Sequence, residues 1–329
     1  MSAPAGDHRP GWRPAAFNKG WTYRERVPKT AEGSWFSAWL ASTHRHSTLH
    51  VWQERLGRGE LSRNGAIVLS DVLLSAGDRI IWQRPPWREP AIPDQWEVLL
   101  DDGDLLVINK PSGLPVTPGG GFLMHTLTAL LDQRSRSAGD HLPPRPVHRL
   151  GRFTSGVQVC ARQPETRAVL ARQFRPKGGF RKVYQAWAQR VDGLTAGQTI
   201  VLTSDVVERR HPLLGWIWGP EPLCAEPVRK RLSACSEIRL LERRDAGDRL
   251  EVTIQTGRPH QIRIHLAQLG SPLLGDPLYL LNREIAASVT PGDGGYRLHA
   301  WRLDAPGMSL CCPVTESSQD WAVSKRQDG

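Results

Sequence analysis

The sequence predicts an α+β protein whose central sheet is mostly antiparallel. Segments with strand-like alternation far outnumber strand–helix–strand units, which argues against a doubly wound parallel sheet. No internal repeat is visible, so a solenoid or propeller is not expected. Hydrophobic residues make up 39% of the 329 residues and charged residues 23%, a balance typical of soluble globular proteins.

Shifts in composition divide the chain into five parts. Pro, Gly and Ala dominate its start without periodicity, which predicts a disordered lead-in over residues 1–29. The stretch PPWREPAIP (85–93) is dense in proline, which disfavours helices and central strands, so we place a linker there. A small module at 30–84 precedes this linker, a large domain at 94–314 follows it, and a tail covers 315–329.

The small module is predicted to contain two short helices and a hairpin. The helices lie within 34–44 and 47–59, where several Trp and Leu side chains are available for a small core. The residues that follow alternate in polarity and carry two turn signals, Asn-Gly at 64–65 and Ala-Gly-Asp at 76–78. We therefore expect a hairpin that ends in a strand over 79–82.

The large domain is predicted to alternate strands with helices. One helix has a proline near its start and the other is closed by a glycine, which are the usual positions of these residues. The predicted strands lie within 96–111 (two strands around a turn), 155–162, 181–189 and 249–257, and the predicted helices within 164–174 and 260–270.

The charge distribution points to a polyanionic partner. The formal net charge is +10 and the isoelectric point is near 9.8. Between Arg145 and Lys182 the chain has ten Lys or Arg residues and a single acid, Glu165. Such a bias inside a folded segment is expected of a surface that contacts a phosphate backbone.

Several classes of protein are excluded by patterns that the chain lacks. Its five cysteines form no C-x-x-C pair and its eleven histidines no H-E-x-x-H pattern, so we expect reduced thiols and no metal site. Uninterrupted apolar stretches are too short to cross a membrane, so no membrane partner is expected. The first residues lack the apolar core of a secretory signal, which makes the cytoplasm the expected location.

Four segments of the large domain stand out in the sequence. Three of them carry candidate binding residues without a decisive pattern. In INKPSGLPVTPGGG (108–121) a strand precedes a Gly-rich loop, but P-loop spacing is missing, so a mobile surface loop is the simpler interpretation. In VHRLGRFTSGVQVCAR (147–162), Arg149 and Arg152 flank a tight Leu-Gly step before a strand. Tyr184 lies on a predicted strand, where either packing or function would explain it.

The fourth unusual segment is TGRPHQIRIHLAQLGSPLLGDPLY (256–279). Arg258, His260, Arg263 and His265 crowd the start of its predicted helix. Backbone N–H groups at a helix start already favour an anion. We therefore expect at least one of these side chains to bind a ligand.

Together the four segments resemble the RluA-type RNA pseudouridine synthases. In that family a Lys-Pro strand, an HRLD-x-x-TSG loop, a Lys-x-Tyr strand and a GR-x-HQIR-x-H helix with a following GD-x-x-Y occur in this order. The resemblance spans roughly 97–312, and Leu298-His299-Ala300 is similar to the closing strand of the family. The matching residues are Lys110-Pro111, His148-Arg149-Leu150, Thr154-Ser155-Gly156, Lys182-Val183-Tyr184, Gly257-Arg258, His260-Gln261-Ile262-Arg263, His265, Gly275-Asp276 and Tyr279.

The resemblance implies a fold, a reaction and a partner. The large domain would be a pseudouridine synthase domain with a mixed, mostly antiparallel sheet and flanking helices, and 30–84 looks like an S-four-type RNA-binding module. The reaction would need no cofactor and no metal. It would break the glycosidic bond of a uridine flipped out of ribosomal or transfer RNA and rejoin the base through carbon 5. Such enzymes are usually monomers.

The resemblance also implies roles for single residues. Tyr184 would stack on the uracil and is a candidate base, Arg263 would form a salt bridge with the family's catalytic aspartate, and Arg149 would fill the space left by the flipped base. The other residues implied to bind RNA or the base are His148, Arg152, Thr154, Lys182, Arg258, His260 and Gln261.

The sequence departs from the family at Gly151, which stands where the catalytic aspartate is expected. Glycine offers neither a nucleophile nor a charge, and Arg263 would be left without its partner, which is costly for a buried cation. Three interpretations stay open: a displaced carboxylate such as Asp276, an inactive RNA-binding or RNA-chaperone protein, or an enzyme of another class. A similar HRLG motif is familiar from a plant and cyanobacterial branch of the family.

Overall fold

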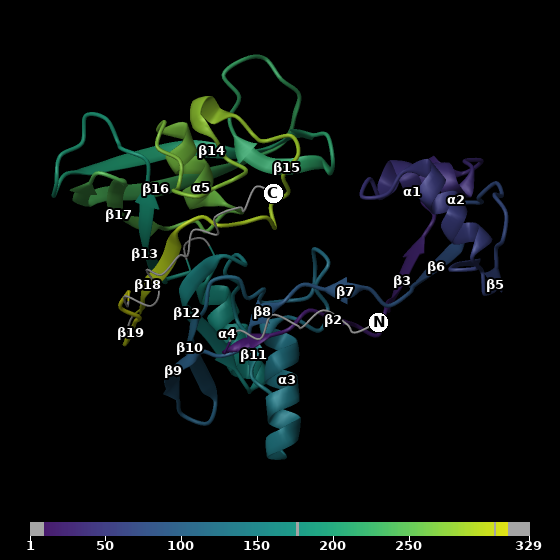
Figure 1. Ribbon diagram of the computed structural model, residues 1–329, viewed down its shortest axis with the longest axis horizontal. Helices are drawn as coiled ribbons and strands as arrows, with labels where there is room; N and C mark the ends of the chain where they lie inside the picture. Colours follow the sequence, from purple (N-terminus) through teal and green to yellow (C-terminus); the bar gives the residue numbers. More distant parts are fainter. Residues whose placement is uncertain (1–9, 176–177, 306, 315–329) are drawn as a thin grey trace, which may run out of the picture. The chain divides into compact units, whose positions relative to one another are not determined.

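A computed structural model of the chain describes residues 10–175, 178–305 and 307–314. The chain divides into two compact units (Figure 1). The smaller unit consists of Ala15–Glu89 with His211–Gly215, and the remaining residues form the larger unit, which carries the motifs. The predicted tail at 315–329 lies outside the described residues.

The smaller unit contains the predicted helices and hairpin. Among its Trp and Leu side chains, Trp39, Leu40, Trp52 and Leu56 belong to one buried core, whereas Trp35 and Leu49 are exposed. Its strands β3, β6, β4 and β5 form a sheet in this order. The elements are β2 (Ala16–Phe17), β3 (Trp21–Arg26), η1 (Lys29–Ala31), α1 (Phe36–Thr43), α2 (Leu49–Gly57), β4 (Leu61–Arg63), β5 (Ala66–Ile67), β6 (Arg79–Arg84) and β7 (Arg88–Glu89).

The predicted boundaries of this unit were wrong at both ends. Residues 10–29 were expected to be disordered, yet β3 pairs with β6 along its whole length, so backbone pairing outweighs the low hydrophobicity of this stretch. The linker expected at 85–93 is paired as well. Its strand β7 binds β2, and β8 (Ile92–Pro93) binds β1 (Trp12–Arg13) in the larger unit. Proline is tolerated in such short edge ribbons.

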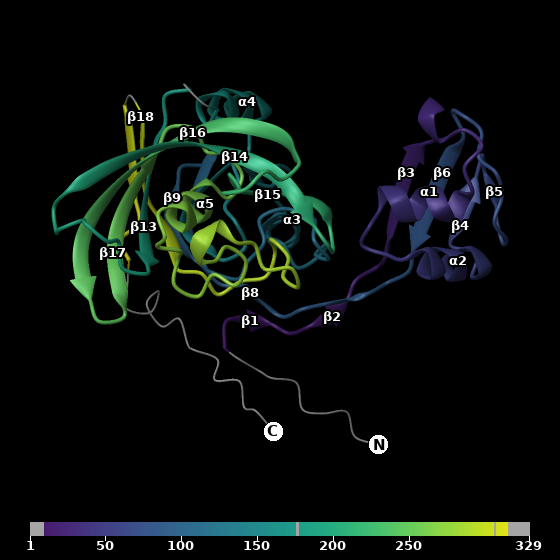
Figure 2. The ribbon, with the colours of Figure 1, turned by 90° about the horizontal axis from the view of Figure 1, so that it is seen from above.

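The larger unit is built on one mixed sheet with helices on both faces, as the sequence predicted (Figure 2). Among the described residues this sheet has eleven strands, in the order β15-β14-β16-β17-β13-β18-β12-β10-β9, with β11 on β12 and β19 on β18. Most neighbours are antiparallel, whereas β12 and β18 run parallel near its middle.

The strands and helices of the larger unit extend the sequence prediction. No element was predicted for the long strands β14 and β16 or for α3. Beyond β1 and β8, the elements are β9 (Glu97–Asp101), β10 (Leu105–Lys110), α3 (Leu127–Ala138), β11 (Arg145–Pro146), β12 (Thr154–Ala161), α4 (Pro164–Gln173), β13 (Arg181–Ala188), β14 (Thr199–His211), β15 (Gly215–Pro220), β16 (Val228–Arg244), β17 (Gly247–Ile254), α5 (Gln261–Gln268), η2 (Leu281–Arg283), β18 (Leu298–Ala305) and β19 (Met308–Cys311).

Alternation along β10 explains how two helices cover opposite faces of one half of the sheet. Leu106 and Ile108 pack against α3, whereas Val107 faces α4, as expected for side chains that point alternately to either face. In the other half, Ile262 and Leu266 of α5 pack on β16 and β17. The Tyr184 side chain packs against both the α3 core and the α5 core. Tyr184 therefore lies at the junction of the two halves.

Close backbone contact accounts for Gly156 in the Thr-Ser-Gly motif. Its φ is +103°, and a Cβ atom there would lie 2.2 Å from the Ala300 carbonyl oxygen. Gly156 is paired with Ala300 where β12 and β18 run parallel. Only glycine accepts both this φ and this distance. The motif therefore permits the central strand pairing that places the loop before β12.

The described residues contain neither a helix that could span a membrane nor a cluster of metal-binding side chains. None of their helices has the length and apolar character needed to cross a bilayer. No group of three or more His, Cys, Asp and Glu side chains in this part of the chain could hold a metal ion.

Candidate active site

The motif segments surround one cleft in the larger unit. Its volume is about 620 Å³, within the range of small-molecule sites. It is lined by the loop after β10, the loop before β12, strand β13, the start of α5 and the segment before β18. The polar and charged side chains among its lining residues are those of Thr117, His148, Arg149, Arg152, Thr154, Lys182, Tyr184, Arg258, His260, Gln261, Arg263 and Tyr296.

Lys110 ties the loop after β10 to the loop before β12. Its buried Nζ donates to the carbonyl oxygens of Pro111 (2.8 Å), Leu114 (2.9 Å) and Arg152 (3.0 Å). Burial lowers the pKa of Lys110 well below its ordinary value, while the three acceptors match the three N–H groups of an ammonium ion. Arg152 Nε also donates to the Gly113 carbonyl at 3.1 Å. The Lys-Pro motif thus holds one wall of the cleft.

His148 was predicted to bind RNA, but its ring holds the loop before β12 in place. Its Nε2 accepts the backbone N–H of Val159 at 3.0 Å, and its ring stacks on Phe174 with centroids 4.2 Å apart. Burial lowers the pKa of His148 to about 3, and Lys182 adds to the effect, so the imidazole stays neutral. Gln158 also binds this loop, donating to the His148 carbonyl at 2.8 Å.

Gln261, another predicted binding residue, likewise serves the structure. Its Oε1 accepts the backbone N–H of Arg258 (2.9 Å) and the hydroxyl of Thr256 (2.6 Å). Its Nε2 donates to the Cys235 carbonyl (2.8 Å) and to Ser236 Oγ (3.0 Å). This side chain closes the turn before α5 and joins it to β16. The amide has little hydrogen-bonding capacity left for a ligand.

His260 stands at the start of α5 in a strained conformation. Its φ is +53°, which is uncommon for a residue other than glycine and is found more often at functional sites. Its Nδ1 lies 2.6 Å from the Tyr279 hydroxyl, and that hydroxyl donates to the Trp218 carbonyl at 2.8 Å. Burial lowers the pKa of His260 to about 3, with Arg263 and Arg149 adding to the effect.

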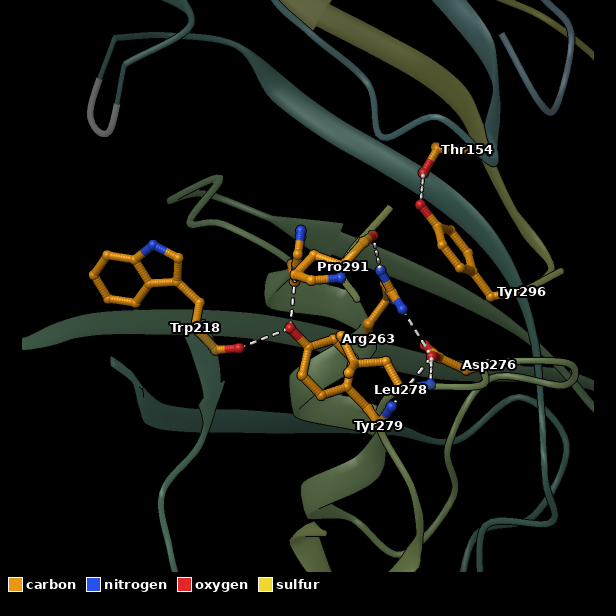
Figure 3. A network of polar contacts seen from close by, with 9 residues as sticks. Thr154, Trp218, Arg263, Asp276, Leu278, Tyr279, Pro291 and Tyr296 are labelled. Carbon is orange, nitrogen blue, oxygen red and sulfur yellow. Dashed lines mark hydrogen bonds and ion pairs between the residues drawn. The ribbon is translucent and has the colours of Figure 1, made fainter. Parts of the chain in front are cut away.

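Arg263 is not left without a partner, contrary to the expectation from Gly151. Its guanidinium forms a two-point ion pair with Asp276, Nε to Oδ2 at 2.7 Å and Nη2 to Oδ1 at 2.8 Å (Figure 3). The two side chains are 3% and 0% exposed. Burial alone would lower the pKa of Arg263, but the Asp276 carboxylate outweighs burial and raises it.

Asp276 is fully occupied and lies outside the cleft lining. Besides Arg263, its Oδ1 accepts the backbone N–H groups of Leu278 (3.0 Å) and Tyr279 (3.2 Å). Asp276 explains how Arg263 is neutralised, and it does not supply a carboxylate to the cleft.

Comparison with known proteins decides the family. The sequence pattern of the RNA pseudouridylate synthases matches residues 104–268. An uncharacterised RNA pseudouridine synthase of Synechocystis is 38% identical over 273 residues, 78% of this chain and 84% of that protein. The chain belongs to the RNA pseudouridylate synthase family.

Two further likenesses agree with membership of the synthase family. Ribosomal large subunit pseudouridine synthase D of Xylella fastidiosa is 32% identical over 79% of this chain and 75% of that protein. The solved structure of human RNA pseudouridylate synthase domain containing 4 covers 68% of this chain and 90% of its own, with a TM-score of 0.51 and 23% identity. The latter likeness shows the synthase fold.

Within this synthase fold, the charge in the cleft has one sign. No Asp or Glu occurs among its described lining residues, whereas arginines and Lys182 line several walls. Lys182 Nζ donates to the Phe174 carbonyl at 3.0 Å, and burial lowers its pKa. Arg149 is exposed. The cleft is therefore suited to an anionic ligand such as a nucleotide phosphate.

Sequence reasoning missed Tyr296, which lines the cleft beside Gly151. The Tyr296 hydroxyl lies 3.4 Å from Thr154 Oγ1 (Figure 3), and its ring covers the Arg263 guanidinium at 4.1 Å. Its place two residues before Leu298-His299-Ala300 is the one signal in the sequence that could have drawn attention to it. The family pattern itself ends at 268 and does not reach it.

Proposed function

We propose that this chain isomerises uridines in folded RNA to pseudouridine and that the reaction takes place in the cleft. The observation that carries the proposal is the convergence on one cleft of the four sequence segments, although they are up to about 150 residues apart. A protein that only binds RNA has no evident need for the half-buried Tyr184 among the lining residues of such a cleft.

In this proposal Tyr184 forms the surface on which the flipped uracil stacks. Its side chain packs against both the α3 core and the α5 core of the larger unit, and base stacking on an aromatic ring contributes about 1–3 kcal/mol. Burial raises the pKa of Tyr184 to about 12, so the phenol is protonated at neutral pH. We assign it stacking and hydrogen bonding rather than the role of a ready base.

The remaining site assignments follow from charge and exposure. Arg149, Arg152 and Arg258 are proposed to bind phosphates beside the target uridine, with Lys182, Thr154 and His260 nearer the base. His148 and Gln261 hold the walls in place, and Arg263 acts from beneath Tyr296 as a fixed cation. These assignments agree with the single sign of charge in the cleft.

The target proposed for the enzyme is ribosomal or transfer RNA. One relative is named for the large ribosomal subunit, and the smaller unit, with its helix pair and short sheet, is proposed to be the S-four-like RNA-binding module. We further propose that the protein acts as a monomer in the cytoplasm.

The second candidate is an RNA-binding protein that has lost catalysis. It is favoured by Gly151 and by the lack of a carboxylate among the described residues that line the cleft. The two candidates share their RNA-binding surface, so they differ only in turnover.

Tritium release from RNA labelled at uracil carbon 5 separates the two candidates. We expect the wild type to release tritium, because formation of the new bond displaces the hydrogen from carbon 5. Tyr184→Ala should slow release by about 10- to 100-fold through loss of stacking, and Tyr184→Phe, which keeps the ring, should slow it less. A wild type that binds RNA without releasing tritium would establish the non-catalytic candidate.

RNA binding should weaken steeply as salt rises. Each phosphate contact releases counterions, and a few such contacts lower affinity by about tenfold or more between about 50 and about 200 mM salt. Filter binding with a folded ribosomal RNA fragment measures this slope, and Arg149→Ala should make it shallower. Binding that is insensitive to salt would contradict the assignment of these arginines to phosphates.

A further inference from the structure

Tyr296 is held rigidly beside the position of the missing aspartate. The side chain is buried, and its ring lies between the guanidinium of Arg263 (4.1 Å) and the ring of Phe153 (centroids 6.1 Å apart, edge to face). This packing leaves the hydroxyl at the cleft end of the ring, 3.4 Å from Thr154 Oγ1 (Figure 3).

The backbone before Tyr296 is fixed by close contacts. Asp293 Oδ2 accepts the backbone N–H of Thr290 at 2.7 Å and its hydroxyl at 3.0 Å, which closes a turn. A Cβ atom on Gly294 would lie 1.8 Å from the Phe153 ring. A Cβ atom on Gly275 would lie 2.5 Å from the Gly295 carbonyl oxygen. The segment therefore has little freedom to carry Tyr296 elsewhere.

The Tyr296 hydroxyl explains why residue 151 is a glycine. Gly151 does not have a positive φ, so its backbone conformation is open to any residue. A Cβ atom on Gly151 would instead lie 2.5 Å from the Tyr296 hydroxyl oxygen and 3.3 Å from Thr154 Oγ1. The phenol oxygen thus occupies the space that the first atoms of an aspartate side chain would need.

We propose that the Tyr296 hydroxyl takes the place of the family's catalytic carboxylate and faces the anomeric carbon of the flipped uridine. This inference rests on the proposed function. Tyr296 would then be a catalytic residue, and Gly151 would leave the space that its hydroxyl occupies.

In the proposed chemistry Tyr296 stabilises charge and does not act as a nucleophile. The C1′–N1 bond breaks and leaves its electron pair on uracil, so C1′ becomes electron-poor, and a phenol lone pair stabilises it without a covalent bond. After the base turns, an electron pair from C5 forms the C1′–C5 bond. The hydrogen on C5 leaves as a proton and N1 takes one up, so the overall reaction is an isomerisation.

Two carboxylates near this region are poorer candidates. Asp276 is fully occupied by Arg263 and two backbone N–H groups. Asp293 is exposed and closes the turn with Thr290. Because asparagine can accept the same hydrogen bonds, Asp293→Asn preserves the turn and removes only the charge.

The test is single-turnover tritium release by wild type and Tyr296→Phe at saturating protein. Phenylalanine keeps the ring against Arg263 and Phe153 and removes only the hydroxyl. We expect Tyr296→Phe to release tritium at least about 100-fold more slowly, with RNA affinity within about twofold of wild type and Asp293→Asn close to wild type. A loss of less than about tenfold for Tyr296→Phe, or a silent Asp293→Asn, would overturn the inference.

A second measurement covers variants that fold poorly. Gly151→Ala should lower both the unfolding midpoint and the rate, because its methyl group displaces the hydroxyl. In a Tyr296→Phe background the same change should lower the midpoint much less, because only the 3.3 Å contact with Thr154 Oγ1 remains. Equal effects in both backgrounds would show that the hydroxyl does not occupy this space. A wild type without turnover would refute the proposed function instead. The unfolding midpoints of the Gly151→Ala variants do not depend on turnover, so they test the position of the hydroxyl in either case.

Discussion

Asp276→Asn is expected to destabilise the protein by about 3–5 kcal/mol. The substitution leaves the Arg263 guanidinium buried without a counter-charge, because Arg263 and Asp276 are 3% and 0% exposed. The rings of Tyr279 and Tyr296, which lie 4.8 and 4.1 Å from this guanidinium, cannot neutralise it. Urea unfolding of wild type and variant at neutral pH measures the loss.

An exposed ion pair provides the matched control for Asp276→Asn. Arg244 contacts Glu242 with nearly the same two-point geometry, at 2.7 and 2.9 Å, but the two side chains are 52% and 39% exposed. Glu242→Gln should therefore change stability little, because solvent screens such pairs. Removing both charges, with Arg263→Gln in Asp276→Asn, should cost less than the two single changes added together. Equal losses of unfolding free energy for Asp276→Asn and Glu242→Gln would contradict the conclusion that burial makes the Arg263–Asp276 pair essential to stability.

Lys110→Met is expected to cost about 2–4 kcal/mol and to impair RNA turnover more than RNA binding. Methionine fills a similar volume but leaves the carbonyls of Pro111 and Leu114 without their donor, and each unsatisfied buried acceptor costs about 1–3 kcal/mol. Relief from burying an ammonium ion offsets part of this cost. Arg152, whose carbonyl also loses a bond, would then shift in the cleft.

Urea unfolding and single-turnover assays together check the Lys110 prediction. Lys230→Met is the control, since Lys230 is exposed on β16, and it should alter neither stability nor turnover appreciably. If Lys110→Met loses less than about 1 kcal/mol, the three hydrogen bonds do not hold the cleft wall as described.

Local sequence signals predicted much of the fold correctly. The Asn-Gly turn at 64–65, the proline at the start of α4 and the glycine after α5 act within a few residues, so their consequences are visible in the sequence. The strands at 12–26 were missed because their stability comes from pairing with residues about 50–80 positions away. Low local hydrophobicity carries no information on such pairing.

The site shows the same division between local and long-range information. The motif order was enough to select Tyr184, Arg149 and Arg263, which line one cleft. The motif order could not separate residues that are free to bind a ligand from residues such as His148 and Gln261, whose hydrogen bonds hold the protein's own backbone. That distinction depends on hydrogen bonds to Val159, Cys235 and Ser236, which the fold brings close.

The sequence by itself predicted the family and the α+β class, and it places a glycine at residue 151. Only the tertiary structure decided what surrounds that glycine. Arg263 is paired with Asp276, 13 residues away, and the space at Gly151 is taken by the hydroxyl of Tyr296, 145 residues away. A glycine can be read from the sequence, but the group that fills the space beside it depends on packing, which joins distant parts of the chain.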